Sequence, residues 1–231
     1  MVHMAAESGT TDLVCTPHAN LTYRFEPERV SDRIAEVSSA ADSAVHLHFG
    51  CDFHLSYENI HDALENPRKY TIGHKNYLLV EFSDLMIFRN TPEILGRLQE
   101  TGLIPVVTHP ERNPLLRQRI DEMEAWVEAG ARVQVTAQSL LGDFGRRAKE
   151  CAETLLDSRL VHFVASDAHS CERRPPRLDL AYAWLKEKHG EALAEALCVA
   201  NPRAVLQGET LETDSREVAA VSRKWYQLWR S

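Results

Sequence analysis

The sequence lacks the apolar and basic segments that mark membrane and secreted proteins, and it lacks the positive charge of nucleic-acid-binding proteins. It has no apolar run of about 18 residues, the length that a transmembrane helix needs. Residues 1–9 contain neither the basic region nor the apolar region of a signal peptide, so we expect a cytoplasmic protein without membrane insertion. The formal net charge of −8 argues against binding to nucleic acid, because such binding depends on Lys and Arg side chains that neutralise phosphates.

Cysteine is also scarce. The five cysteines are scattered and odd in number, and no C-x-x-C pair occurs among them. A disulfide framework or a thiolate metal site would need cysteines at short, regular spacings. We therefore expect reduced thiols.

Short β-rich runs alternate with helical stretches along most of the chain. This pattern is typical of an α/β fold in which helices cover a parallel sheet, and 231 residues with 44% hydrophobic content suffice for one such core. The expected strands are residues 12–16, 45–49, 77–82, 104–108, 132–136 and 160–165. The expected helices are residues 28–38, 57–64, 92–101, 115–129, 143–157 and 178–189.

Both ends of the chain depart from this alternation. Residues 1–8 are compatible with a helix that ends at Gly9, and we therefore expect the given sequence to open in a helix rather than a strand. After Gly208 the sequence is acidic and then aromatic, which predicts a C-terminal helical extension over residues 209–231. Residues 173–176 (RRPP) are expected to form a loop.

Histidine and acidic side chains recur where the expected strands end. The carboxyl ends of parallel strands meet at one edge of a sheet, so residues far apart in the sequence converge there. Imidazole and carboxylate groups without thiolates suit divalent ions such as manganese, iron or zinc, and a set of more than four ligands indicates more than one ion. The predicted metal ligands are His18, Asp52, Glu81, His109, Asp167 and His169.

Each of these residues, taken alone, is more often a cap or a hydrogen-bonding group of a loop than a ligand, so the repeated placement carries the prediction. Other histidines are given other roles. His46 and His48 lie inside an expected strand and are interpreted as packing or surface residues, while His54 and His74 are expected beside the ligands. His3 is excluded as a ligand because it lies in the first helix.

Two arginines stand close to candidate ligands in the sequence. Arg112 follows His109 by three positions, and Arg174 follows His169 by five. A guanidinium group matches phosphate oxygens and stabilises the charge of phosphoryl transfer. The alternatives are a salt bridge with a carboxylate of the sheet for Arg112 and a solvated loop charge for Arg174.

Four segments together resemble the PHP (polymerase and histidinol phosphatase) family. Within it, they are most similar to the manganese-dependent protein-tyrosine phosphatases of bacterial capsule and exopolysaccharide operons. Residues 136–145 (TAQSLLGDFG) also look like a strand-to-helix passage of this subfamily. The four segments are 16–20 (TPHAN), 79–82 (LVEF), 108–113 (THPERN) and 165–169 (ASDAH).

The resemblance implies a distorted (β/α)7 barrel of the PHP type over residues 1–208, with up to three divalent metal ions, manganese first among them. It places the six predicted ligands at the family's ligand positions and gives Arg112 and Arg174 the role of holding the phosphoryl group during in-line attack by water. The implied substrate and partner is the phosphotyrosine tail of a bacterial tyrosine kinase that controls capsular or exopolysaccharide synthesis. Asp52 is a departure, because the family usually has Glu at that position.

A larger departure lies at the front of the chain. Family members open with a strand that carries His-x-His, whereas residues 1–9 here resemble the helix that follows it. We therefore expect the first strand of the barrel to be missing, through a start codon further upstream or through a true truncation.

Other functions remain open at this point. A cysteine-dependent tyrosine phosphatase is disfavoured relative to metal chemistry. Four of the five cysteines have no arginine six positions later, and the fifth, Cys171 with Arg177, lies around the expected loop at residues 173–176. The alternatives are a PHP phosphatase of a small metabolite, such as histidinol phosphate, and a binding module with an impaired metal site. The sequence is also compatible with a homo-oligomer.

Overall fold

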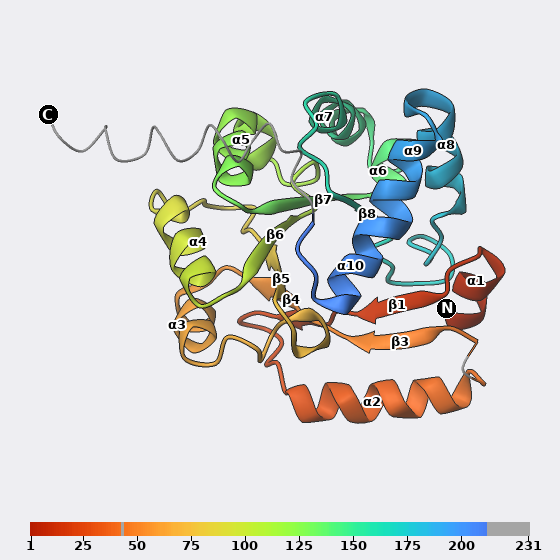
Figure 1. The fold of residues 1–231 in the computed structure, drawn as a ribbon, viewed down its shortest axis with the longest axis horizontal. Coiled ribbons are helices and arrows are strands. Elements are labelled where there is room, and N and C mark those ends of the chain that lie inside the picture. The colour runs from red at the N-terminus through yellow and green to blue at the C-terminus, as the bar shows by residue number, and fades with distance from the viewer. Residues whose placement is uncertain (43, 212–231) are drawn as a thin grey trace, which may run out of the picture.

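The structure is a computed structural model that describes residues 1–42 and 44–211, and it shows parallel strands with helices packed around them (Figure 1). Residues 212–231, which make up most of the C-terminal extension predicted for residues 209–231, lie outside the described residues. Within the described part, no helix has the length and apolar character to cross a bilayer. The strands are β1 (Asp12–Cys15), β2 (His18–Ala19), β3 (His46–Phe49), β4 (Asp52–His54), β5 (Tyr77–Glu81), β6 (Ile104–Thr108), β7 (Arg132–Thr136) and β8 (Phe163–Ala165).

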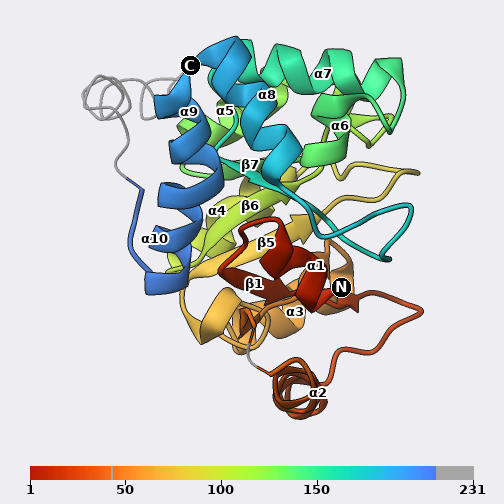
Figure 2. The same cartoon turned by 90° about the vertical axis from the view of Figure 1, so that its right-hand side faces the viewer.

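The helices lie on the outside of the strands, with α2 on one side of the molecule and α7 and α8 on the opposite side (Figures 1 and 2). Three further single turns, η1, η2 and the π-helical η3, complete the described elements. Their bounds are α1 (Val2–Glu7), α2 (Pro27–Ala40), α3 (Tyr57–Glu65), η1 (Ile72–His74), α4 (Thr91–Glu100), η2 (Leu116–Gln118), α5 (Ile120–Glu128), α6 (Ala137–Leu141), α7 (Arg146–Asp157), α8 (Asp179–His189), α9 (Glu191–Glu195), η3 (Ala196–Ala200) and α10 (Asn201–Gln207).

All strand pairs are parallel, and from β4 to β8 neighbours in space follow one another along the chain. β1 pairs with β3, and the remaining strands form a sheet in the order β2-β4-β5-β6-β7-β8. The Asp52 N–H donates to the Pro17 carbonyl at 3.1 Å, so pairing continues from β1 and β3 into β2 and β4. Among the described residues, no strand joins β8 to β1 or β2. The predicted α/β fold with a parallel sheet is confirmed.

Apolar side chains bury both faces of this sheet. Along β5, Leu78 and Val80 belong to the large core beneath the outer helices, and Tyr77 and Leu79 belong to a smaller core on the other face. A parallel strand covered on both sides reads as a continuous apolar run rather than an alternating one. This explains the composition of β5.

Helix α10 covers the smaller core at the amino ends of the strands. Its residue Val205 packs in that core with Tyr77. The Tyr77 hydroxyl donates to the Glu209 carbonyl at 2.8 Å, and the Asn76 amide donates to the Gly208 carbonyl at 3.2 Å. The end of α10 is therefore tied to the start of β5, and the polar strand ends lie at the opposite edge of the sheet.

Most expected elements are present, with differences in length that have local causes. β6 and β7 have the expected bounds, and the first helix is observed as α1. The helix expected from residue 143 begins at Arg146, because Gly145 has a φ of 84°. The last strand begins at Phe163 rather than residue 160, because the Leu160 N–H still donates to the Leu155 carbonyl at 3.0 Å.

Gly50 lies between β3 and β4, against the end of β1. A Cβ atom at Gly50 would lie 2.6 Å from Val14 Cγ1 and 3.0 Å from Thr16 Cγ2. Gly50→Ala should therefore lower the free energy of unfolding by about 1–3 kcal/mol through overpacking, as measured by urea denaturation. The matched control is Gly96→Ala in α4, where a Cβ meets nothing within 4 Å and stability should rise by about 0.5–1 kcal/mol. Equal effects of the two substitutions would contradict this account.

Candidate functional site

The pairing of the strands brings predicted ligands together from distant parts of the sequence. In the register of the sheet, His18 of β2 lies opposite Asp52 of β4, and His54 of β4 lies opposite Glu81 of β5. His109 directly follows β6, and its N–H donates to the backbone of β7 at 2.9 Å. Because cross-strand neighbours are within reach of one another's side chains, the sheet itself assembles the site.

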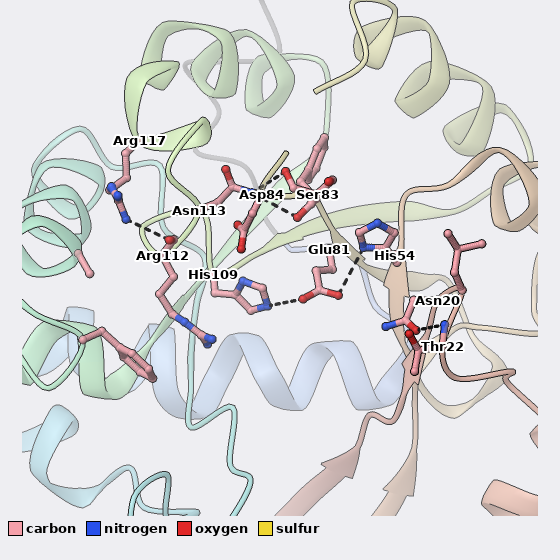
Figure 3. Close-up of a pocket in the computed structure, with 14 residues that line it drawn as sticks. Asn20, Thr22, His54, Glu81, Ser83, Asp84, His109, Arg112, Asn113 and Arg117 are labelled. Atoms are coloured by element: carbon pink, nitrogen blue, oxygen red, sulfur yellow. Dashed lines mark hydrogen bonds and ion pairs between the residues drawn. The ribbon is translucent and has the colours of Figure 1, made fainter. Parts of the chain in front are cut away.

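Four of the predicted ligands form one group, which we call the four-residue cluster: His18, Asp52, Glu81 and His109. His18 Nδ1 lies 3.1 Å from Asp52 Oδ2 and 3.5 Å from Glu81 Oε2. His109 Nε2 lies 3.7 Å from Glu81 Oε1 and 3.9 Å from Asp52 Oδ2. Glu81 lies between His109 and His54, whose Nδ1 is 3.6 Å from Glu81 Oε2 (Figure 3).

Three members of the four-residue cluster are placed to fit a divalent metal ion. One ligand atom each of His18, Asp52 and Glu81 lie within 4.8 Å of one another. Buried His18 Nδ1 and Asp52 Oδ1 find no well-directed hydrogen-bond partner among the described residues. An unsatisfied buried polar atom is costly unless another partner, such as an ion, takes its place. Imidazole and carboxylate groups are ligands of manganese, iron and zinc, so the donor chemistry agrees.

The charges of the cluster reinforce one another. The close carboxylate of Asp52, and then that of Glu81, raises the pKa of His18 to about 10. Burial alone would lower the pKa of His109, but the neighbouring Asp52 carboxylate outweighs it and the net shift is upward. Burial alone would raise the pKa of Asp52 and of Glu81, and the surrounding imidazoles reverse this to a net decrease for both. His18 therefore carries a proton at neutral pH in the metal-free protein, and a metal ion that binds this imidazole would have to displace it.

Asp167 and His169 lie on the loop after β8, beside the four-residue cluster. The Asp167 carboxylate accepts hydrogen bonds from both Arg112 and Arg174. His169 Nδ1 lies 3.0 Å from the Asp167 carbonyl oxygen, and the His169 ring centroid is 6.1 Å from that of His18. The structure thus joins the two predicted phosphate-binding arginines through one carboxylate. The roles of all six residues as ligands stay predictions.

The backbone is strained at two of the predicted site residues. His109 and Asp167 have φ values of 36° and 47°, in the left-handed region that disfavours residues other than glycine. Such positions cost of order 1–3 kcal/mol each and concentrate at functional sites. Asp42, His74 and Arg159 also have positive φ in turns, so the informative feature is the location of His109 and Asp167 at strand ends.

Phe144 covers both arginines. The guanidinium carbon of Arg112 lies 4.4 Å from the Phe144 ring centroid, and that of Arg174 lies 5.7 Å from it. Cations within about 6 Å of an aromatic ring face are attracted to it. Phe144 lies in the 136–145 segment that the sequence singled out, but its role was not predicted, because that role depends on two arginines from other loops.

Glu111 anchors the loop that carries His109 and Arg112. It is fully buried, and its Oε1 accepts hydrogen bonds from the Thr136 N–H at 2.9 Å and the Ser139 hydroxyl at 2.7 Å. Both partners lie at the start of α6. Glu111 therefore fixes the β6 loop to the element that leads to Phe144, a function that the sequence did not reveal.

Asn113 joins this loop to the loop after β5. Its Nδ2 donates to the carbonyls of Phe82 at 3.2 Å and Ser83 at 3.0 Å. Its Oδ1 accepts from the backbone N–H groups of Leu115 at 2.9 Å and Leu116 at 3.0 Å. The side chain amide thus bridges two loops at the site.

A pocket of about 470 Å³ opens in front of the cluster (Figure 3). Glu81, His109 and Arg112 contribute charged walls, and Phe82 and Phe144 contribute apolar ones. Its volume is within the range of sites for small ligands and side chains. A phosphorylated side chain could therefore enter with its phosphoryl group toward Arg112.

The other histidines have separate surroundings. His54 is beside the cluster, as expected. His74 is not, and that prediction is wrong: its ring stacks on Phe49 with 4.1 Å between centroids, and its Nδ1 lies 3.2 Å from the Arg68 carbonyl. His48 Nε2 pairs with Asp12 Oδ1 at 2.7 Å and takes no part in the cluster.

The chain is similar to known proteins over nearly its whole length. Residues 1–207 match the family model described as capsular polysaccharide synthesis, CpsB/CapC. Sequence identity to CapC of Staphylococcus aureus is 31%, over 99% of this chain and 90% of that protein. Identity to the tyrosine-protein phosphatase YwqE of Bacillus subtilis is 30%, over 91% of this chain and 84% of that protein.

A similar fold is found in a solved structure. The crystal structures of YwqE from Bacillus subtilis and CpsB from Streptococcus pneumoniae are described as those of metal-dependent tyrosine phosphatases. A chain from that work matches with a TM-score of 0.85 and 30% identity, over 93% of this chain and 87% of that chain.

Replacing Glu111 should test its role as an anchor. Glu111→Ala leaves the buried Thr136 N–H and Ser139 hydroxyl without their acceptor, so the free energy of unfolding should fall by about 2–3 kcal/mol. Glu111→Gln keeps an acceptor oxygen and should cost less. Urea denaturation of the three proteins measures the difference, and an alanine variant as stable as the parent would remove Glu111 from this role.

Metal binding should release protons. Because the pKa of His18 is raised to about 10, this imidazole is protonated at neutral pH and must lose a proton before it can become a ligand. Affinity for Mn²⁺ should therefore increase as the pH rises through the neutral range. Calorimetric titrations in buffers of different protonation enthalpy measure the proton count. His18→Ala should reduce it, and the matched control His48→Ala should not. Binding of Mn²⁺ without proton release would contradict the prediction.

Proposed function

The chain belongs to the CpsB/CapC family of capsular polysaccharide synthesis and is a metal-dependent tyrosine-protein phosphatase, and we propose that manganese is its metal and that a bacterial tyrosine kinase carries its substrate. The substrate would be the phosphorylated tyrosine tail of a kinase that controls capsule or exopolysaccharide synthesis. The membership of the chain in a family of capsular polysaccharide synthesis supports this partner. We further infer that the sequential parallel strands belong to a distorted (β/α)7 barrel of the PHP type.

One observation carries the assignment of the chemistry: a cluster of imidazoles and carboxylates adjoins a pair of arginines at one end of the sheet. His18, Asp52, Glu81 and His109 would hold a metal ion, with Asp167 and His169 as further ligands. When bound, divalent ions lower the pKa of water and neutralise charge on phosphoryl oxygens. These side chains suit metal-dependent hydrolysis of a phosphate ester.

The arginines would bind the phosphoryl group itself. A guanidinium offers several donors in a planar fork that matches phosphoryl oxygens. Arg112 lines the pocket, and buried Arg174 Nε has no hydrogen-bond partner among the described residues. Asp167 holds both guanidinium groups toward the same place. Orientation by this carboxylate positions the donors before the substrate arrives, which favours stabilisation of the transferring group.

Release of phosphate from a phosphotyrosine peptide tests this function. Turnover should require Mn²⁺ and should fall, without the ion, to the level of an Asp167→Asn variant. Arg174→Ala should lower kcat/KM by about 100-fold through loss of a phosphoryl donor. The matched control is Arg173→Ala at the exposed neighbouring position, which should stay within about twofold of the parent.

Two outcomes would go against the proposal. Turnover no higher than that of the Asp167→Asn variant in the presence of Mn²⁺ would contradict hydrolysis by this chain. If a small metabolite such as histidinol phosphate is hydrolysed faster than any phosphotyrosine peptide, the chain would instead be a PHP phosphatase of small metabolites.

A further inference from the structure

A second, smaller pocket adjoins the one in front of the cluster. It has a volume of about 160 Å³ and lies between the segments that follow β4 and β5. His54, Phe82 and Ser83 line both pockets, so these residues form a shared wall. The remaining wall of the second pocket is largely apolar and consists of Leu55, Ser56, Tyr57, Met86 and Phe88.

Apolar side chains are exposed around the two pockets. Leu85 is 91% exposed and Met86 55% on the loop after β5, and Tyr57 is 76% exposed at the start of α3. Leu21, on the loop after β2, is 90% exposed and lines the first pocket. Single exposed apolar residues are ordinary, but a group of them around a concave surface marks an interaction site. These four side chains come from the loop after β2, the start of α3 and the loop after β5.

The shared wall is held in place from behind. The buried Phe82 ring stacks on Trp126 with 5.4 Å between centroids. The Asn113 amide fixes the carbonyls of Phe82 and Ser83 at 3.2 Å and 3.0 Å. A preformed wall lowers the entropic cost of ordering the protein when a ligand binds. The exposed side chains of Met86 and Tyr57 would then bury apolar surface on contact.

We propose that the second pocket binds an apolar side chain next to the phosphotyrosine in the substrate peptide. The assignment rests on the proposed function and follows from the shared wall. With the phosphotyrosine in the first pocket, the neighbouring residues of an extended peptide, spaced about 3.3 Å apart, pass over His54, Phe82 and Ser83. A cavity of about 150 Å³ holds one benzene-sized group. The second pocket therefore accepts one side chain such as Leu, Met or Phe, and it distinguishes a protein substrate from a small phosphate ester.

The test uses phosphotyrosine peptides with Ser and Gly around the phosphorylated residue, in which a single Leu is moved through the flanking positions. At one position the Leu should raise kcat/KM about tenfold through a lower KM, because its side chain leaves water. Met86→Ser should abolish this gain. Hydrolysis of p-nitrophenyl phosphate, which carries no flanking residue, should report on the first pocket alone. The matched control is Val37→Ser, an exposed apolar residue in the last turn of α2, which should retain the preference for Leu.

The outcomes separate this inference from the proposed function. If p-nitrophenyl phosphate is hydrolysed but Leu has the same effect at every position, the second pocket is not a peptide site. If no substrate is hydrolysed, the proposed function fails. The second pocket can then still be tested by titrating the protein into labelled phosphotyrosine peptides and measuring fluorescence anisotropy. A Kd that does not depend on the position of the Leu would overturn the proposal that this pocket binds a peptide side chain. If Met86→Ser changes the sedimentation coefficient but leaves the peptide kinetics unchanged, the surface instead contacts a second copy of the chain.

Discussion

The parallel register of β2, β4 and β5 is the constraint on which the site depends. It sets His18 opposite Asp52 and His54 opposite Glu81. Side chains along a strand alternate between the two faces, so a slip of one residue in β5 would turn Glu81 toward the outer helices. Apolar residues on both faces of β5 make such a slip costly, because each would move into the wrong core. The packing that stabilises the fold therefore also aligns the functional groups.

Charges of opposite sign alternate across the site. Asp52 and Glu81 are like charges in a partly buried place, and their ionised forms persist because imidazoles surround them. Asp167 repeats this arrangement with two guanidinium groups. Removal of one partner would leave a charge without compensation, which is far more costly than loss of a surface ion pair. The same alternation places imidazoles and carboxylates next to a pair of guanidinium groups, the arrangement on which the proposed function rests.

Features carried by local sequence patterns could be predicted, and those that depend on distant partners could not. Each member of the four-residue cluster lies at or beside the end of a strand that the sequence reveals, and parallel strands made their meeting predictable. Glu111 is different, because its function depends on Thr136, 25 positions away. Helix α10 was missed because the short helical turns after Gly190 lack a long apolar period. His74 was misplaced because histidine alone carries no information on which partner it will meet.

The two arginines are brought together by Asp167 and by the strained backbone that positions it. Guanidinium groups repel each other, so a shared carboxylate is required to hold both near one point in a half-buried loop. A phosphoryl group brings about two negative charges and three acceptor oxygens to the same donors. Under the proposed function, it would replace the carboxylate as their partner, and most of the cost of bringing the arginines together would already be met during folding. The left-handed φ of Asp167 and the contact of Phe144 with both guanidinium groups then have one physical purpose. Under the proposed function, they would keep the phosphoryl site assembled while no phosphoryl group is bound.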